Sequence, residues 1–579
     1  MASLEEKRHS LAHLLAQAVL VEHPNAQLTL GPAVDNGFYY DIDFGAEKVS
    51  DTDLPGIEKE MRKHLSDWKE FTHKEVTADE ANAAFSNPYK AELIKEISER
   101  GETITLYTCG GFTDLCRGGH AEHPAADIAP NSFKLDRVAG AYWRGDEKNP
   151  MLTRIYGLAF DTKEELDAYL AQREEAKKRD HRKIAKEQGL LVFSDLVGSG
   201  MPMFTPKGNI IRSEIINFSR ELNAELGFGE VHTPNINKGE LFKISGHYDQ
   251  YKEDMLTVHS QYVEDEMFLK PMNCPQHTQI YASEPRSYRD LPIRFSDFAV
   301  LYRDERPGEL SGLTRLRAFS QDDGHIFCRE DQIEGEITNV LAAIQKALAT
   351  YRVDYWVRLS LRDPTKKDKY IGEDAVWEKA EAIMRKLLTE KKMSHKEALG
   401  EAAFYGPKMD IMAVDAIGRE WQISTIQLDL NMPGRFGLEY AAEDGTKKTP
   451  VMIHRALTGS PDRFMGILIE HYAGALPLWL SPVQVRVLPV SEKHNAYAAE
   501  VMVALKAANI RTEIDDANES LGKKIRNTKT EKIPYVLVVG DAEIANGTVT
   551  AEHRTEGKIG EMKVADLIQK LTEEIKTRS

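Results

Sequence analysis

Apolar positions along the chain change their period from one region to the next. From residue 210, "IIRSEIINFSRELNAELGF" carries apolar side chains at helical spacing and ends near a glycine, which predicts an amphipathic helix. Further on, "VDYWVRLSL", "MDIMAV" and "EWQISTIQLDL" predict strands separated by turns. We therefore expect a largely antiparallel sheet with covering helices between residues 196 and 478.

The two ends of the chain have other patterns. Residues 480–579 alternate apolar runs such as "VQVRVLPV" and "YVLVVG" with amphipathic helices, which predicts a compact α/β domain with a mainly parallel sheet. Residues 1–160 mix short helices with strand-like runs such as "GFYYDIDF". Residues 163–188 are highly charged with sparse apolar positions, which is typical of a solvated linker helix.

Composition narrows the class of protein. The 579 residues include 75 basic and 92 acidic side chains, a net charge of −17, so any nucleic acid must be met by local basic patches. No apolar run approaches the ~20 residues of a membrane span, and the N-terminus has no signal-peptide layout. The four cysteines make no disulfide framework. We expect a cytoplasmic protein in a reducing compartment, without a membrane partner.

Cys274, in "FLKPMNCPQHTQIY", has an unusual setting between an asparagine and a proline. It has no CxxC neighbour, so a metal site would need ligands from distant segments, and His325 and His454 are the candidates. Three protein ligands leave the fourth position of a zinc ion open, as in catalytic sites. By spacing alone, a buried cysteine and two hydrogen-bonded core histidines remain the alternative.

Arginines and a helix start accompany these candidate ligands. "LYRDERPGELSGLTRLRAFSQDD" has Arg303 and Glu305 before a loop and Arg315 after it. Guanidinium groups bind phosphate through two parallel hydrogen bonds and stay charged. In "LTGSPDRFMGILIEH", Gly459 and Arg463 lie at the start of an amphipathic helix, whose N-terminus favours anions. Taken singly, each arginine is better explained as part of a surface salt bridge.

The ordered set of motifs resembles the class II aminoacyl-tRNA synthetases. "YRDE" with "RLRAFSQDDGH" is similar to motif 2, "GSPDR" to motif 3, and the helix leading to "GFGEVHTP" to motif 1. "KPMNCP", "AFYGPKMD", "WQISTIQLDL" and "PVMIHRA" resemble the threonyl-tRNA synthetases in particular, and the resemblance covers essentially the whole chain. It implies a multidomain α+β and α/β protein. Its parts would be an α+β editing domain (1–160), a linker helix (161–195), a catalytic domain with the class II antiparallel sheet (196–478) and an α/β anticodon-binding domain (479–579).

The resemblance implies a threonine–tRNA ligase. Such an enzyme activates L-threonine with ATP to threonyl-adenylate and transfers the threonyl group to the 3′ end of tRNA(Thr). It also hydrolyses mischarged seryl-tRNA(Thr) after transfer. One Zn²⁺ per chain on Cys274, His325 and His454, Mg²⁺ with the ATP, and a homodimer are further implications.

Two alternatives differ from this interpretation. One is a non-catalytic RNA-binding regulator on the same scaffold, which the loss of a motif arginine or of a zinc ligand would favour. The other is a sibling synthetase specific for proline or serine. Every motif arginine and zinc ligand is present, and "HSLAH" with "CRGGH" points to an editing domain. These features jointly favour the threonine enzyme.

The family pattern also implies roles for individual residues. Arg303 and Arg463 are the expected catalytic residues. The expected ATP-binding residues are Arg303, Glu305, Arg315, Phe319, Gln422, Thr425 and Arg463. The expected threonine-binding residues are Met272, Cys274, Arg303, Gln321, Asp323, Tyr405, Gln427 and His454.

Amino-acid selection predicts a second site. A zinc ion could bind both the amino group and the hydroxyl of threonine, and valine lacks the hydroxyl. Serine has both groups and lacks only a methyl worth about 1–3 kcal/mol, so a hydrolytic sieve is required. In "HSLAH", His9 and His13 lie on one helix face, and "DLCRGGH" adds Cys116 and His120.

These four side chains have two readings. By spacing alone they fit a structural Cys-His₃ zinc site as well as a catalytic role. They also resemble the editing domain that threonyl-tRNA synthetases share with alanyl-tRNA synthetases, and that resemblance favours a site without metal; whether it holds one stays open. The expected editing residues are His9, His13, Tyr40, Lys90, Asp114, Cys116 and His120.

The last segment, "NESLGKKIRNTKTEKIPYVLVVGD", resembles an anticodon-binding domain, with Asn518 and Glu543 at base-reading positions. The segment also contains a basic cluster, made of Lys523, Lys524, Arg526, Lys529 and Lys532. This cluster either contacts tRNA phosphates or is simply a solvated surface. The chain departs from many relatives in two respects. It opens directly at the editing block, without a preceding small β-rich domain, and Glu552 stands where an anticodon-reading arginine is common. We expect His553 or Arg554 to substitute after a small shift.

Overall fold

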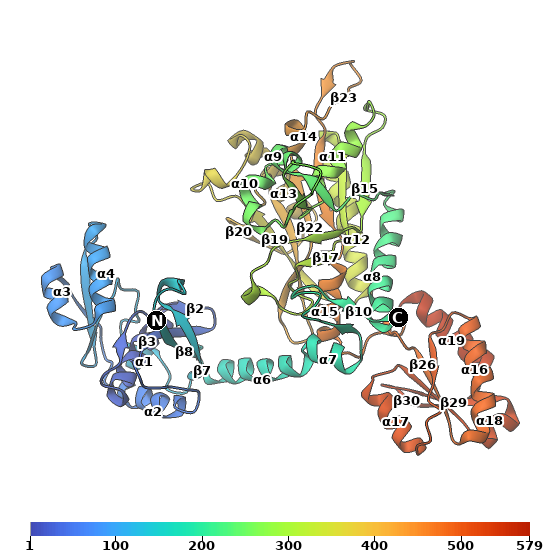
Figure 1. Cartoon of the computed structure of the whole chain (residues 1–579), viewed down its shortest axis with the longest axis horizontal. Helices are drawn as coiled ribbons and strands as arrows, with labels where there is room; N and C mark the ends of the chain where they lie inside the picture. The colour runs from blue at the N-terminus through green and yellow to red at the C-terminus, as the bar shows by residue number, and fades with distance from the viewer. Residues whose placement is uncertain (1) are drawn as a thin grey trace. The chain divides into compact units, whose positions relative to one another are not determined.

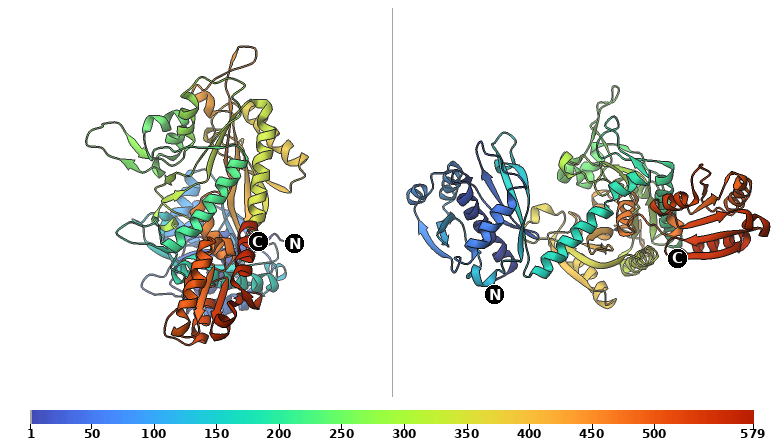
Figure 2. Two further views of the ribbon diagram at one scale, coloured as in Figure 1. Left: turned by 90° about the vertical axis from the view of Figure 1, so that its right-hand side faces the viewer. Right: turned by 90° about the horizontal axis from the view of Figure 1, so that it is seen from below.

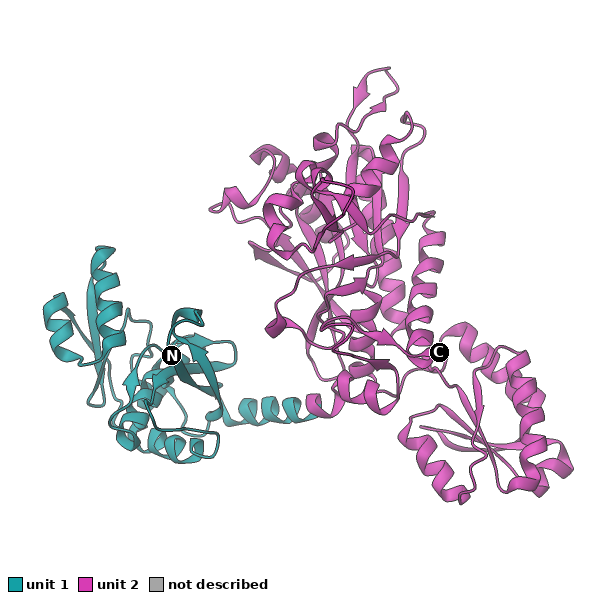
Figure 3. Cartoon of the chain, in the orientation of Figure 1, with its two compact units in different colours: residues 1–175 teal, residues 176–579 magenta. Residues whose placement is uncertain are grey.

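The structure is a computed structural model that describes residues 2–579 and divides into two compact units, 1–175 and 176–579 (Figure 3). The division falls inside α6 (Lys163–Arg179), within the segment that the sequence predicts as a linker. The linker is two helices, because Asp180 caps a second one, α7 (His181–Glu187), by accepting a hydrogen bond from the backbone N–H of Arg182. The domain boundaries expected at 160, 195 and 478 stay predictions.

Unit 1 packs helices against an antiparallel sheet in the order β1-β3-β8-β7, with β2 paired to β3. The strands are β1 (Gln27–Leu28), β2 (Ala33–Val34), β3 (Gly37–Asp43), β7 (Phe133–Tyr142) and β8 (Met151–Ala159). Helix α1 (Leu4–Glu22) starts at a capping box formed by Ser3 and Glu6, and it buries Leu11, Leu15 and Val19 against this sheet. The remaining elements are α2 (Leu54–Leu65), β4 (Thr72–Val76), α3 (Ala78–Ala84), α4 (Pro88–Glu99), β5 (Ile104–Cys109), β6 (Phe112–Leu115) and α5 (Pro124–Asp127).

Unit 2 is built on a sheet in the order β11-β15-β18-β25-β22-β21-β19-β20. Its pairs are antiparallel except β11 with β15 and β19 with β20, so the antiparallel sheet expected from the sequence is confirmed. The strands are β11 (Gly229–Glu230), β15 (Ile293–Asp297), β18 (Asp323–Cys328), β19 (Asp354–Leu361), β20 (His395–Leu399), β21 (Lys408–Val414), β22 (Glu420–Asp429) and β25 (Val451–Ala456).

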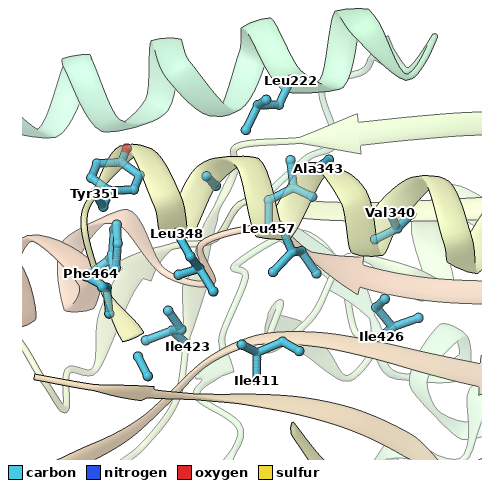
Figure 4. Packing of buried hydrophobic residues seen from close by; sticks show 14 of the residues in the cluster. Leu222, Val340, Ala343, Leu348, Tyr351, Ile411, Ile423, Ile426, Leu457 and Phe464 are labelled. Atoms are coloured by element: carbon cyan, nitrogen blue, oxygen red, sulfur yellow. The ribbon is translucent and has the colours of Figure 1, made fainter. Parts of the chain in front are cut away.

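Helices α8 (Pro206–Glu225) and α12 (Ile333–Thr350) lie side by side along one face of this sheet (Figures 1 and 2). Leu222, Leu348 and Ile426 belong to the large core between them and the strands (Figure 4). Alternate residues of β18, β22 and β25 therefore point into this core, and the residues between them line the opposite face. That opposite face holds the candidate site.

A buried ion pair fixes the register of β18 and β25 on the core face. Gly324 lies opposite Arg455, and a Cβ atom on Gly324 would be 2.4 Å from the Arg455 guanidinium carbon. Arg455 donates to Asp322 at 2.8 Å and to Asn223 at 2.5 Å, and its guanidinium lies 4.2 Å from the Phe228 ring centre. A fully buried charge needs such partners, and only glycine leaves space for them.

The C-terminal sheet has the order β27-β26-β28-β29-β30. Its pairs are parallel as far as β28, but β28 with β29 and β29 with β30 are antiparallel, so the expected mainly parallel sheet is wrong for this half. Helix α17 lies on one side of the sheet and α16 and α19 on the other (Figure 1). The elements are β26 (Val485–Pro489), α16 (Asn495–Ala507), β27 (Thr512–Ile514), α17 (Leu521–Thr530), β28 (Tyr535–Val539), α18 (Asp541–Asn546), β29 (Thr548–His553), β30 (Gly557–Lys563) and α19 (Val564–Thr577).

Short elements surround the large sheet. They are β9 (Leu191–Val192), β10 (Met203–Phe204), β12 (Ile236–Lys238), α9 (Gly239–Ser245), α10 (His247–Tyr251), β13 (Thr257–Val258), β14 (Met267–Leu269), α11 (Cys274–Ala282), β16 (Val300–Tyr302), β17 (Ala318–Ser320), α13 (Asp374–Glu390), α14 (Met432–Arg435), β23 (Tyr440–Ala441), β24 (Lys447–Lys448) and α15 (Pro461–His471). Among the described residues, no helix is both long and apolar enough to cross a membrane.

Candidate functional sites

Cys274, His325 and His454 come together on the open face of the large sheet. His325 and His454 lie directly opposite each other on β18 and β25, and Cys274 begins α11. One ligand atom from each of the three residues lies within 4.8 Å of the others, and all three residues are buried. The distant segments expected from the sequence therefore meet at one point.

This donor set fits a zinc ion. The Nε2 atom of His325 lies 3.1 Å from the Nδ1 atom of His454. Zinc–nitrogen bonds in a tetrahedral site put two ligand nitrogens about 3.3 Å apart, close to this separation. Burial lowers the pKa of His325 well below its usual value, with the positive charge of nearby histidines adding to the effect, so the ring stays neutral as a ligand must.

Each histidine of the triad is held by a second buried side chain. The Nδ1 atoms of His277 and His325 lie 2.8 Å apart, and Nε2 of His454 lies 3.0 Å from Oδ2 of Asp429. Sequence reasoning missed His277 and Asp429. A signal for His277 existed, because it follows Cys274 by three residues and three residues is one helix turn. Such partners orient metal ligands and raise their basicity.

The expected threonine-binding residues surround the triad. The Tyr405 ring stacks on the His454 ring with centres 4.6 Å apart, and its hydroxyl donates to Gln427. Asp323 accepts a hydrogen bond from the Asn273 side chain at 3.0 Å. Gln427, on β22, lies opposite His454 of β25. Gln427 and Gln321 both line the cavity next to the triad. Met272 lines a neighbouring cavity together with Arg303.

The cavity next to the triad has a volume of about 490 Å³. Both arginines expected to be catalytic line it, Arg303 from the segment after β16 and Arg463 from α15. The expected ATP-binding residues that line it are Arg303, Glu305, Arg315, Phe319, Gln422, Thr425 and Arg463. The structure therefore brings together the whole set assigned to ATP.

The start of α15 is shaped for an anion. Ser460 caps the helix by accepting a hydrogen bond from the backbone N–H of Arg463 at 3.2 Å. Gly459 has φ +73°, and a Cβ atom there would lie 2.3 Å from the Ile423 carbonyl oxygen. The Nε atom of Arg463 is buried without a hydrogen-bond partner among the described residues. An arginine that lines the cavity at a helix N-terminus favours a phosphate there.

Asp410 orients Gln422 and Thr425, two polar side chains that line the cavity. Its Oδ1 accepts hydrogen bonds from Gln422 at 2.9 Å and from Thr425 at 3.0 Å. Its Oδ2 accepts from Ser360 at 2.8 Å and Arg358 at 3.1 Å. Asp410 was not predicted from the sequence, because a single acidic residue within a strand gives no motif.

Arg315 and Glu305 face each other across the motif 2 loop. Arg315 donates to Glu305 at 2.8 Å and to Glu309 at 3.0 Å. Arg303 lies over the Phe319 ring, with its guanidinium carbon 5.2 Å from the ring centre. To bind a phosphate, the Arg315 guanidinium would therefore give up its hydrogen bond to Glu305 or to Glu309.

Unit 1 has a cavity of its own, of about 440 Å³. The expected editing residues that line it are His9, His13, Tyr40, Lys90, Asp114 and Cys116. His120 does not line the cavity, but its Nε2 lies 3.3 Å from the Cys116 sulfur, and the His9 Nε2 lies 3.4 Å from the same atom. The sequence prediction therefore identified one real cluster.

Asp114 organises the buried half of this cluster. It accepts a hydrogen bond from Tyr40 at 2.6 Å, lies 3.0 Å from the Nδ1 atom of His13, and forms an ion pair with Lys90. Burial alone would raise the pKa of Asp114, but Lys90 and His13 hold it well below its usual value. Lys90 has only 2% of its surface exposed, and the Asp114 carboxylate balances its charge.

The pKa values of His13 and Cys116 are shifted in opposite directions. Burial alone would lower the pKa of His13, but its contacts with Asp114 and Cys116 raise it to about 9. Burial alone would raise the pKa of the Cys116 thiol, but hydrogen bonds with His120, His13 and His9 lower it to about 3. A thiolate with so low a pKa is a weak base, so in this cluster it holds the neighbouring imidazole rings by charge and hydrogen bonding.

In the C-terminal region, Asn518 lines a cavity of about 370 Å³. Both carboxylate oxygens of Glu543 are engaged, by the Gly540 N–H at 2.9 Å and the Thr550 hydroxyl at 2.7 Å, so base reading by Glu543 stays a prediction. In the basic cluster, Lys524 is buried and donates to the carbonyl oxygen of Asp515 at 2.9 Å. It is therefore not free for a tRNA phosphate.

Arg554, one of the two residues expected to replace the missing arginine, is also engaged. Arg554 donates to the carbonyl oxygens of Lys532 and Ala475, both at 2.7 Å, and supports the chain instead of a base. Glu552 itself forms an ion pair of 2.8 Å with Lys529. Substitution by Arg554 would require breaking these buried contacts.

Comparisons with protein families match most of the chain in three blocks. Residues 256–472 match the tRNA synthetase class II core domain (G, H, P, S and T), and residues 484–574 match an anticodon binding domain. Residues 104–156 match the threonyl and alanyl tRNA synthetase second additional domain. The first block contains Cys274, His325 and His454, and the third contains Cys116 and Asp114.

Curated relatives match almost the entire length. A threonine–tRNA ligase of Cytophaga hutchinsonii is 47% identical over 98% of this chain and 88% of its own length. A threonine–tRNA ligase of Bacteroides fragilis is 48% identical with the same coverage. Among solved structures, one described as the RNA binding domain of threonyl-tRNA synthetase from Cryptosporidium parvum has a TM-score of 0.65 at 37% identity, covering 68% of this chain and 98% of that one.

Proposed function

Because this chain belongs to the threonine–tRNA ligase family, we propose that its two cavities perform the synthetic and the hydrolytic steps of one pathway to threonyl-tRNA. The chain is an aminoacyl-tRNA synthetase, a ligase with a class II core, an anticodon-binding domain and an editing domain. It charges tRNA(Thr) with threonine at the expense of ATP and hydrolyses seryl-tRNA(Thr) formed in error. The observation that carries the proposal is the Cys-His-His triad next to a cavity lined by Arg303 and Arg463.

Adenylate formation is the in-line attack of the threonine carboxylate on the α-phosphate of ATP. In our proposal, Arg303 bridges the carboxylate and the α-phosphate, and Arg463 and Arg315 bind the outer phosphates with Mg²⁺. The adenine ring packs on Phe319 near Glu305. Catalysis of this kind depends on positioning and on the neutralisation of phosphate charge. Arg463 supports this assignment, because it lines the cavity at the start of α15 and its charged neighbours are two further arginines, Arg315 and Arg303.

Threonine binding uses the triad and its neighbours. We propose that Cys274, His325 and His454 hold one zinc ion per chain. When bound, zinc offers its open coordination to the amino group and hydroxyl of threonine, and valine lacks the second group. Asp323 is positioned by Asn273 to accept a hydrogen bond from the amino group, and Gln427 and Tyr405 close the side of the pocket. An apolar pocket alone would separate the two amino acids by only about 10²-fold.

Editing uses the cluster of unit 1. We propose that the seryl ester enters the 440 Å³ cavity and that the Cys116 thiolate holds His9 and His120 in place. His120, whose pKa is lowered by burial, is then a neutral ring that accepts the proton of the attacking water. His13 and Lys90 carry positive charge beside Asp114 and can stabilise the developing oxyanion.

We also propose that the enzyme is a cytoplasmic homodimer. The free cysteines suit a reducing compartment. Exposed apolar side chains precede the motif 1 helix α8, and an apolar surface of this kind favours a protein partner. They are Val192, Phe193, Leu196, Val197 and Met203. Light scattering on the wild type and on Leu196→Asp tests this, since a dimer that uses this surface should dissociate in the variant.

The decisive experiment is ATP–pyrophosphate exchange with threonine, serine and valine on protein of known zinc content. Exchange with threonine, weak exchange with serine and none with valine, at one zinc per chain, is the expected result. Folded, zinc-loaded protein that exchanges with none of the three would overturn the proposal. It would favour the non-catalytic RNA-binding regulator instead.

A further inference from the structure

A third group of metal-ligand side chains in unit 2 combines Asp180 and His181, at the start of α7, with Glu470 of α15. The buried ring of His181 has Nδ1 2.6 Å from the Glu470 carboxylate. The backbone N–H of Leu313 donates to Nε2 at 2.9 Å. Because Nε2 accepts, the ring hydrogen is on Nδ1 and is donated to Glu470. With both nitrogens occupied by protein groups, this cluster is not a metal site.

The surroundings of His181 are fitted to this contact. A Cβ atom on Gly312 would lie 2.2 Å from His181 Nε2, and Gly312 has φ +50°. A Cβ atom on Gly466, in α15, would lie 3.0 Å from Leu313 Cβ. The second carboxylate oxygen of Glu470 lies 2.6 Å from Arg419. Two glycines and a buried ion pair therefore hold the ring and the loop together.

The anchored residue belongs to the wall of the nucleotide cavity. Residues 311–315 form a tight turn, in which the Thr314 N–H donates to the Ser311 carbonyl at 2.9 Å and the Ser311 N–H donates to the Arg315 carbonyl at 3.2 Å. Leu313, Thr314 and Arg315 all line the cavity. The Leu313 N–H has its partner in His181 outside the turn. Loss of the His181 ring would leave the buried N–H of Leu313 without an acceptor, and the turn would be free to move.

We propose that His181 is a positioning residue for ATP: from α7, it fixes the turn that carries Arg315 into the nucleotide cavity. It touches no substrate and acts through the Leu313 N–H. The inference rests on the proposed function, because it assigns the cavity to ATP. It adds a direct connection between the first residue of α7 and the phosphate-binding side of the site.

Two substitutions separate the two hydrogen bonds of the ring. A glutamine carbonyl oxygen can take the place of Nε2 and keep the Leu313 contact, whereas an asparagine amide can take the place of Nδ1 and keep only the Glu470 contact. We expect His181→Asn to raise the KM for ATP in the exchange assay about tenfold, equivalent to about 1.4 kcal/mol. The KM for threonine and kcat should stay within about twofold of the wild type, and His181→Gln should retain most of the wild-type KM for ATP.

Equal KM values for ATP in His181→Asn and the wild type, or equal losses in the Asn and Gln variants, would overturn the inference. If His181→Asn shows no cooperative thermal melting, Gly466→Ala decides instead. That variant leaves His181 in place but pushes on Leu313, and it should raise the KM for ATP; an unchanged value would contradict the proposal. A wild type without threonine-dependent exchange would overturn the proposed function, and the two failures are therefore distinguishable.

Discussion

His277 holds the ring of His325 on the side away from His454: the Nδ1 atoms of His277 and His325 lie 2.8 Å apart, and the Nε2 atom of His325 lies 3.1 Å from His454. Behind His277, the Asp297 carboxylate lies 4.0 Å from its Nε2. The Thr233 hydroxyl donates to the same Asp297 oxygen at 2.7 Å. The chain of contacts runs from the protein interior to the His325 nitrogen that faces His454. The orientation of His325 is therefore set before any ion is bound.

His277→Phe keeps a ring of similar shape and removes the hydrogen bond to His325. Outer partners of metal ligands contribute about 10–100-fold to affinity, so zinc release to a chelator should accelerate by a factor in this range. Release is followed with a chromogenic chelator on the loaded protein. His395→Phe, which removes a half-buried histidine outside the triad, is the matched control. Equal release rates in both variants would show that His277 does not support the site.

Cys274→Ala removes the only sulfur ligand of the triad. We expect zinc content to fall well below one per chain and threonine-dependent exchange to be lost, because the remaining two histidines cannot complete a tight site. Metal analysis after dialysis against a weak chelator measures the first effect. Cys328→Ala, at a buried cysteine in the core between sheet and helices, should keep its zinc. A Cys274→Ala protein with one tightly held zinc would contradict the assignment.

His13→Ala removes the imidazolium beside Asp114 and Cys116. Deacylation of seryl-tRNA(Thr) should slow by about 10²-fold or more, as is typical of losing a positioned acid or base. Exchange with threonine should be unchanged, because the nucleotide cavity is formed entirely by residues of unit 2. The control is His23→Ala, which removes a histidine at the end of the same helix. Slowed deacylation in the control variant would point to unfolding of α1 rather than to catalysis.

The lowered pKa of Cys116 predicts its reaction with iodoacetamide. With a pKa of about 3, the group is a thiolate throughout pH 5–8, so its alkylation rate should be nearly constant there. An ordinary thiol, with a pKa of about 8.5, would react about tenfold faster for each added pH unit over the same range. Peptide mass spectrometry after timed alkylation measures Cys116 separately. A rate that rises steeply between pH 6 and pH 8 would mean that the histidines do not hold a thiolate.

Much of the candidate chemistry was predictable from residue types in order along the chain. The triad, the two motif arginines and the editing cluster were predicted because their order along the chain resembles the motifs of a known family, whereas their spacing alone left other interpretations open. The structure brings each set together, and the roles of the residues stay predictions. His181 and Asp410 could not be found in this way. A histidine in a charged linker and an aspartate in a strand acquire their roles only when the turn at Leu313 and the side chains of Gln422 and Thr425 lie next to them.

The C-terminal sheet shows the same limit at the level of topology. Alternating strands and helices predicted parallel pairing, which holds as far as β28. A parallel connection needs a dozen or more residues, but only the short helix α18 (Asp541–Asn546) separates β28 from β29. The chain therefore reverses, and β29 pairs antiparallel with β28. Counting the residues between the two apolar runs would have corrected the prediction.

The pairing of Gly324 with Arg455 has a consequence for the metal-free protein. A shift of β25 by one residue against β18 would turn His454 into the core and Arg455 out of it. In the correct register, the buried Arg455 donates hydrogen bonds to Asp322 and Asn223, which replace its lost hydration. In the shifted register, Asp322 and Asn223 would stay buried without this partner, which is unfavourable. The buried ion pair between Arg455 and Asp322 therefore fixes the register of β25 against β18. If the proposed zinc ion is removed with a chelator, the chain should therefore stay folded and inactive, and it should regain activity when metal is added, without passing through an unfolded state.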